Sequence, residues 1–302
     1  MAPKRLAGTS PVVREVWSQN LETELATIRN LIDWFPVVFL SMEHPGVVAR
    51  PIGAFKSTLE YHYQTVRVNA DILRIVRLGL TFSDQDGNVP QDCSTWQFNF
   101  KFSREIDMIH QTQADTLIKS GVDFQKHEEW GIDVEQFGEL LISSGLILLD
   151  EVRWVAHHAL YDFAYLLKSM TLKPLPIFET EFMELCSLFF PKMWDVLTIY
   201  QSLLPTQSSK TGVQFIWDDL QMPRWQIPPS SSMTSFAIYQ LFFELKLRLN
   251  GQVNDDKFNG NIWGLNVRYP QPQAKIPQSS KGSSAVANNK PSQFNFGNLG
   301  GV

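Results

Sequence analysis

Glu43 is the first residue whose type and position suggest chemistry. It follows a continuous apolar run at residues 36–40, and the β-branched and aromatic residues of that run favour a buried central strand over a helix. His44-Pro45-Gly46 then ends the strand. Sheets of α/β proteins usually place their chemistry at the C-terminal ends of such strands. The sequence therefore indicates that Glu43 anchors a metal site, either a working one or a lost one.

Two acids separated by one residue would both point into such a site, because alternate residues of a strand share a face. With further acids from later helices, such a pair can hold two Mg²⁺ ions about 4 Å apart for phosphodiester cleavage. Here the first position of the pair is Ser41, which is neutral. A single glutamate at a strand end is more often a surface or capping residue, so Glu43 alone is a weak signal.

Asp162 is a second acidic candidate, at a predicted junction between a strand and a helix. A carboxylate in the first turn of a helix is favoured by the helix dipole, so a capping role is the simpler interpretation of Asp162 alone. His157 and His158 are adjacent and would face opposite sides of a strand, so they cannot both bind one ion. The other histidines lack the spacing of zinc ligands: His44, His62, His110 and His127.

The elements that must position these residues follow the hydrophobic pattern. Residues 95–102 alternate between aromatic and polar side chains, which predicts a half-buried antiparallel strand whose aromatic face packs in the core. Further strands are expected at 36–40, 75–82 and 153–159, with a strand and then a helix in 193–203. Helices are expected at 13–34, 111–120, 133–148, 160–170, 179–190, 212–220 and 233–249. This order predicts one α/β domain with a mixed central sheet and helices on both faces.

Composition limits the class of protein. The 302 residues are 44% hydrophobic and 19% charged, which is enough to bury a core, and the net charge of −5 argues against a surface that coats nucleic acid. Only two cysteines occur, as expected in a reducing compartment. We expect a tail at residues 1–13, the domain at 14–266 and a disordered Pro/Ser/Asn/Gly-rich tail at 267–302. Neither a membrane span nor a secretory signal is expected.

Several stretches together resemble one family. They include EHPGVVARPIGAF at 43–55, STWQFNFKF at 94–102, SGVDFQKHEEWGIDVEQFGELLISSGL at 120–146 and YDFAYLLK at 161–168. Over about residues 14–265 the chain resembles the Caf/Pop deadenylase subunit of the eukaryotic CCR-NOT complex, an RNase D-like exoribonuclease of the DEDD type with an RNase H-like fold. The resemblance implies 3′-to-5′ removal of messenger-RNA poly(A) tails with two divalent ions, Mg²⁺ or Mn²⁺. It also implies a NOT scaffold subunit and a second deadenylase subunit as partners, in the nucleus and the cytoplasm.

The metal ligands of that family carry over only in part. The family's first motif is Asp-Thr-Glu-Phe-Pro-Gly, so Ser41 replaces its aspartate and Glu43 keeps its glutamate. The second motif ends in Tyr-Asp and matches Asp162. The third reads His-Gln-Ala-Gly-Ser-Asp, and its histidine and aspartate fall on Pro229 and Thr234. Two of the four metal acids and the general-base histidine are therefore absent, and Glu43 and Asp162 are the candidate catalytic and metal-binding residues that remain.

Three functions stay open from the sequence. Half of the negative charge that balances two divalent ions is missing, which predicts reduced or lost metal binding and a catalytically impaired subunit kept for the complex. Alternatively, the chain is an active poly(A)-specific exoribonuclease in which Asp195 or another carboxylate substitutes for a lost ligand. The third alternative is an RNA-binding module without chemistry, against which the net negative charge weighs.

Overall fold

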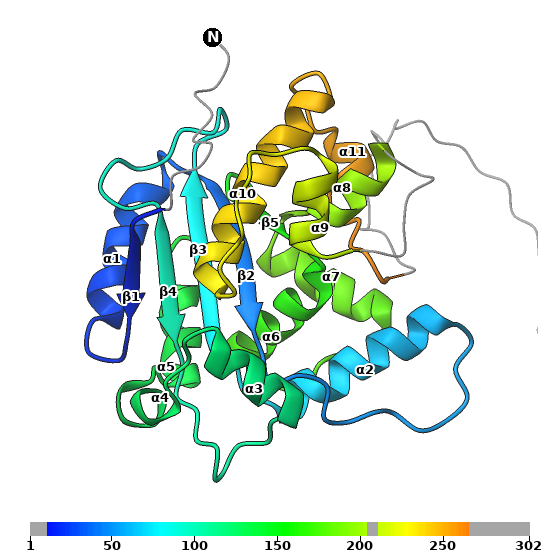
Figure 1. Ribbon diagram of the computed structural model, residues 1–302. Helices are drawn as coiled ribbons and strands as arrows, with labels where there is room; N and C mark the ends of the chain where they lie inside the picture. The colour runs from blue at the N-terminus through cyan, green and yellow to red at the C-terminus, as the bar shows by residue number, and fades with distance from the viewer. Residues whose placement is uncertain (1–10, 204–210, 266–302) are drawn as a thin grey trace, which may run out of the picture. The chain divides into compact units, whose positions relative to one another are not determined.

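A mixed sheet of six strands organises the molecule. The structure is a computed structural model that describes residues 11–203 and 211–265, all within one compact unit. The strand order is β1-β4-β3-β2-β5-β6 (Figure 1), and β3 runs antiparallel to its neighbours β2 and β4 whereas the other pairs are parallel. The strands are β1 (Val13–Val16), β2 (Val37–Glu43), β3 (Arg77–Ser83), β4 (Thr95–Asn99), β5 (Arg153–Ala156) and β6 (Lys192–Asp195).

Helices cover both faces of this sheet. α10 crosses in front of β2 and β3 in Figure 1, while α5 and α6 lie behind the sheet. The described helices are α1 (Leu21–Ile32), α2 (Thr58–Ile72), α3 (Gln111–Lys119), α4 (Phe124–Trp130), α5 (Val134–Ile142), α6 (Ala159–Thr171), α7 (Glu179–Phe189), α8 (Val196–Leu203), α9 (Val213–Asp219), α10 (Ser231–Arg248) and α11 (Asp255–Phe258). In the part of the chain that the structure describes, none of them is both long and apolar enough to cross a membrane.

The side chains of β2 alternate between two cores. Val38 and Leu40 pack with residues of α1, α5 and α6 behind the sheet, and Val37 and Phe39 pack with residues of α8, α9 and α10 in front of it. This alternation follows from the period of two in a strand and explains why the run is apolar at every position. The α/β class, the mixed sheet and the central place of β2 are confirmed.

Three expectations about individual elements were wrong. The predicted helix at 13–34 is β1 followed by α1, so residue 13 belongs to the sheet rather than to a tail. β4 is buried on both faces instead of half-buried, because α10 covers its polar face. β5 ends at Ala156, which leaves His157 and His158 outside the strand. The predicted tail at 267–302 lies outside the described residues.

Candidate functional site

Glu43, the last residue of β2, is held by an arginine from the neighbouring strand. Arg77 begins β3 and lies directly opposite Glu43 in the antiparallel register. Its Nε donates to Glu43 Oε2 at 2.5 Å and its Nη2 donates to Oε1 at 2.8 Å. This two-point geometry is that of a strong arginine–carboxylate pair. Because only 3% of Arg77 is exposed, its charge depends on Glu43 for compensation.

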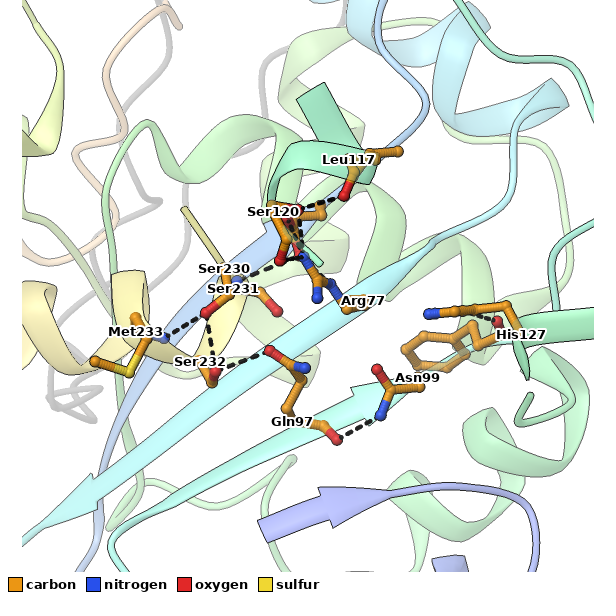
Figure 2. Close-up of polar contacts among 12 residues, drawn as sticks. Arg77, Gln97, Asn99, Leu117, Ser120, His127, Ser230, Ser231, Ser232 and Met233 are labelled. Carbon is orange, nitrogen blue, oxygen red and sulfur yellow. Dashed lines mark hydrogen bonds and ion pairs between the residues drawn. The ribbon is translucent and has the colours of Figure 1, made fainter. Parts of the chain in front are cut away.

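Two further donors complete the surroundings of the Glu43 carboxylate. Ser120 Oγ, just after α3, lies 3.0 Å from Oε1 and 2.8 Å from the Leu117 carbonyl oxygen, and its one hydrogen can serve either acceptor. The N–H of Ser231, at the start of α10, donates to Oε2 at 3.3 Å. Figure 2 shows Arg77, Ser120 and Ser231 gathered at this point. Oε2 thus accepts two hydrogen bonds, and Oε1 accepts one from Arg77 and a second when the Ser120 hydrogen points toward it.

Asp162 lies beside the same strand. It is in the first turn of α6 and is buried, and the backbone N–H of Met42 donates to its carboxyl group. The chain turns from β5 into α6 at His158, which adopts a left-handed conformation with φ of 56°. Burial, and then the negative charge of Asp195, raise the pKa of Asp162 well above its usual value, and the Met42 hydrogen bond opposes this effect only in part. The surroundings therefore favour the protonated form of Asp162.

Asp195, the predicted substitute ligand, joins three segments of backbone. It ends β6, and its Oδ2 accepts from the N–H groups of Ala159 and Trp263, each at 3.1 Å. Its Oδ1 accepts from Leu197 N–H at 2.9 Å. Burial raises the pKa of Asp195 to about 6, and these hydrogen bonds hold it below a higher value. The carboxylate is near Asp162 but is already occupied in fixing the start of α6 and the segment at Trp263.

The three positions at which the motif comparison predicts a lost family residue lie around the same point. Ser41 is paired with Gly79 on β3, two residues from Glu43. Thr234 is in the first turn of α10, where its N–H donates to Ser230 at 2.9 Å. Pro229 is exposed in the bend that precedes α10. The fold therefore brings the segment that begins α10, on which the third motif is predicted to fall, to the end of β2.

Comparison with known proteins decides the family. The model described as CAF1 family ribonuclease matches residues 16–137. Over 255 residues the chain is 46% identical to Poly(A) ribonuclease pop2 of Schizosaccharomyces pombe. The match covers 84% of this chain and 75% of the relative. The chain belongs to the CAF1 ribonuclease family.

Solved structures of CAF1 proteins agree with this assignment. The Mg²⁺- and Mn²⁺-bound form of S. pombe Pop2p matches with a TM-score of 0.80 and 46% identity, covering 85% of this chain and all of that one. A second structure contains yeast CAF1 co-crystallized with the NOT1 MIF4G domain. It matches with a TM-score of 0.68 and 30% identity, and the match covers 84% of this chain and 96% of that one. The predicted family and nuclease fold are confirmed.

The residues present do not fit the two divalent ions that the CAF1 family implies. Within residues 11–203 and 211–265, no group of three or more His, Cys, Asp or Glu side chains is placed to hold a metal ion. Both oxygens of Glu43 are already engaged by protein donors, and Asp162 is in surroundings that favour its neutral form. An ion at this point would also have to displace or approach the guanidinium of Arg77, which repels it.

Sequence reasoning missed Arg77 although one signal was available. Arg77 is the only charged residue in the predicted strand at 75–82, and a charged side chain in a buried strand needs a partner. His44 was also treated as an isolated histidine. It stacks on Tyr161 with ring centres 4.9 Å apart, and burial lowers its pKa to about 4, so it is a neutral aromatic residue of the site.

Proposed function

We propose that this chain is a CAF1-type subunit of a CCR4-NOT deadenylase complex whose own poly(A) hydrolysis is impaired or lost. The observation that carries this proposal is the two-point ion pair between Arg77 and Glu43. In a working two-metal nuclease this glutamate would face a divalent ion. Here the guanidinium supplies positive charge to the same carboxylate from within the fold.

The missing family residues support the same conclusion. Ser41 and Thr234 offer neutral oxygens where two acids would balance the ions, so Mg²⁺ or Mn²⁺ binding is expected to be reduced or lost. Pro229 can neither accept nor orient a proton, and the loss of a general base reduces the rate by about 10²- to 10⁴-fold. Metal binding and proton transfer are both weakened.

An assay on oligo(A) tests the loss of activity. The purified full chain, its Glu43→Ala variant and the S. pombe relative are incubated with 5′-labelled oligo(A) and Mg²⁺ or Mn²⁺. We expect shortening by the relative and none by this chain above the level of Glu43→Ala. Shortening that Glu43→Ala abolishes would contradict the proposal and favour the active enzyme with substitute ligands.

A repaired variant tests the cause of the loss. Ser41→Asp, Thr234→Asp and Arg77→Gln together restore the two acids and remove the guanidinium. Calorimetry with Mn²⁺ should detect binding to the triple variant and none to the unaltered chain. Binding of Mn²⁺ to the unaltered chain with comparable affinity would show that Arg77 does not exclude the ion.

Assembly is the function that we propose in place of hydrolysis. Yeast CAF1 is crystallized with the NOT1 MIF4G domain, and the solved structure that contains both matches this chain. We infer that this chain contacts a NOT scaffold, together with a second deadenylase subunit, in the nucleus and cytoplasm. Co-purification of the full chain with a NOT1 MIF4G domain tests the scaffold contact, and fluorescence imaging of the tagged chain tests the localisation.

A further inference from the structure

A cavity of about 560 Å³ opens beside the Glu43–Arg77 pair, on its β4 side. Strands β1, β3 and β4 form its floor, and α4 and the residues that begin α10 form its walls. Its size is within the range of small-molecule sites. Figure 2 shows several of the lining residues around one space, among them Arg77, Gln97, Asn99, His127 and Ser232.

Three deeply buried side chains line this cavity, each with one polar atom for which the described residues supply no partner. Arg77 uses Nε and Nη2 on Glu43 and Ser120, which leaves Nη1 as a free donor. Asn99 donates through Nδ2 to Glu15, to Val16 and to the Gln97 carbonyl, which leaves its Oδ1 as a free acceptor. The exposed fractions of Arg77 and Asn99 are 3% and 1%. Among the described residues, neither Arg77 Nη1 nor Asn99 Oδ1 is one of the fully buried unpartnered atoms, so a ligand or water in the cavity can reach both.

His127, on α4, supplies the third free atom. Its Nδ1 lies 2.7 Å from the Phe100 carbonyl oxygen, which can only accept, so Nδ1 carries the hydrogen. Burial lowers the pKa of His127 to about 4, and the ring is neutral at pH 7. Its Nε2 is therefore an acceptor. Only 1% of this residue is exposed.

The charges on the wall select against an anion. The Arg77 charge is already compensated by Glu43, whereas Glu15 and Asp123 add two carboxylates to the lining. Lys126 Nζ lies 4.1 Å from the centre of the Trp17 ring, at the edge of the same cavity. A neutral ligand with more donors than acceptors fits this lining, because the free atoms are the Arg77 Nη1 donor and the Asn99 Oδ1 and His127 Nε2 acceptors.

We propose that this cavity binds a guanine base. The base-pairing edge of guanine presents one acceptor, O6, followed by two donors, N1–H and N2–H₂. O6 complements Arg77 Nη1, and the two donors complement Asn99 Oδ1 and His127 Nε2. The base can come from a free nucleoside or from a guanine within an RNA chain. The inference does not depend on whether the chain hydrolyses poly(A).

Calorimetry with three nucleosides tests the proposal on the full chain. Guanosine should bind with one-to-one stoichiometry and about tenfold more tightly than adenosine, which presents a different edge. Inosine lacks the N2 amino group and should bind about three- to tenfold more weakly than guanosine. Equal affinities for the three nucleosides, or no binding at millimolar concentration, would overturn the proposal, and ordered water would then be the partner of these atoms.

Variants on α4 test the assigned contact. His127→Leu should remove the preference for guanosine over inosine, while Gln125→Leu, at an exposed position of the same helix, should retain it. If His127→Leu does not fold, the nucleoside ranking on the unaltered chain still decides the question.

A comparison of two oligonucleotides distinguishes the sources of the base. One is oligo(A), and the other is oligo(A) that contains one internal guanine. Tighter binding of the second indicates a base within RNA, and equal binding restricts the site to the free nucleoside.

Discussion

A guanidinium and a divalent cation can each neutralise a buried carboxylate, but only the ion can dissociate. Arg77 is covalently part of β3, always charged and opposite Glu43 in the sheet register. The pair therefore makes the charge balance of this site a property of the fold and not of the solution. Removing one partner leaves the other charge buried without compensation, so it lowers the stability more than removing both.

Replacement of Glu43 should reveal the ion pair through stability. Glu43→Gln leaves the Arg77 guanidinium buried beside a neutral amide, and we expect a loss of about 3–5 kcal/mol in the free energy of unfolding. Urea denaturation measures it, with Glu139→Gln, an exposed substitution on α5, as the control that changes little. A more stable Glu43→Gln protein would mean that the glutamate is repelled by neighbouring carboxylates rather than held by Arg77.

Removing the charge should stabilise the fold at Asp162, whereas it should destabilise the fold at Glu43. Its folded-state pKa is raised, so the stability that the protonated carboxyl contributes is present below its unfolded pKa and is lost as the pH rises through its folded pKa. Asp162→Asn cannot ionise and should be more stable than the unaltered chain at pH 7.5, with the difference disappearing near pH 4. Urea midpoints at both pH values check this, beside the exposed substitution Asp115→Asn. Destabilisation at pH 7.5 would show that the ionised carboxylate is favoured.

At the scale of elements, the start of α10 lies directly on β3. A Cβ atom at Gly79 would lie 2.2 Å from the carbonyl oxygen of Ser231, so this position accepts only glycine. The same contact brings the Ser231 N–H to Glu43. The approach of the two backbones therefore shapes both the helix packing and the site.

Gly79→Ala should disturb this contact strongly. The added methyl group meets backbone atoms that cannot rotate away, so we expect a loss of at least about 1–3 kcal/mol in the free energy of unfolding. Gly212→Ala is the matched control, because no atom lies within 4 Å of its added Cβ. Chemical denaturation compares the two. Equal stabilities would show that α10 moves away from β3 without loss.

The sequence could predict elements whose signals are local, and these form most of the fold. The apolar run before Glu43 predicted β2, and Asp133 before an apolar-faced segment predicted α5 with its cap, which accepts hydrogen bonds from Glu135 and Gln136. β1 was missed because its four residues are a strand only through parallel pairing with β4, about eighty residues away. The Glu43–Arg77 pair likewise exists only through sheet register, which no single segment encodes.

At the scale of the whole molecule, the interior holds several neutral histidines. Burial is the main cause that lowers the pKa to about 4 for His44, His127 and His158, and to about 3 for His157. In the unfolded chain these groups titrate near 6.5, so below that pH the unfolded state binds more protons. Above pH 6.5 these histidines take nothing from the free energy of unfolding. As the pH falls from 6.5 toward their folded-state pKa values, the free energy of unfolding decreases. Asp162, whose pKa is raised well above its usual value, and Asp195, with its pKa raised to about 6, oppose this trend, but they are two groups against four histidines.

The chain should therefore unfold more easily in mild acid, and one substitution tests the cause. Between pH 7.5 and 5 each of these histidines removes up to about 2 kcal/mol from the free energy of unfolding. The family motif has phenylalanine at the position of His44, whose ring is stacked between Tyr161 and Tyr165, so His44→Phe suits the space. Urea denaturation at both pH values should show a smaller loss for His44→Phe than for the unaltered chain, by about the contribution of one histidine. His110→Gln, at an exposed position, should keep the full loss. If the midpoint does not fall with pH, or if His44→Phe falls as steeply as the unaltered chain, buried histidines do not set the acid sensitivity of this molecule.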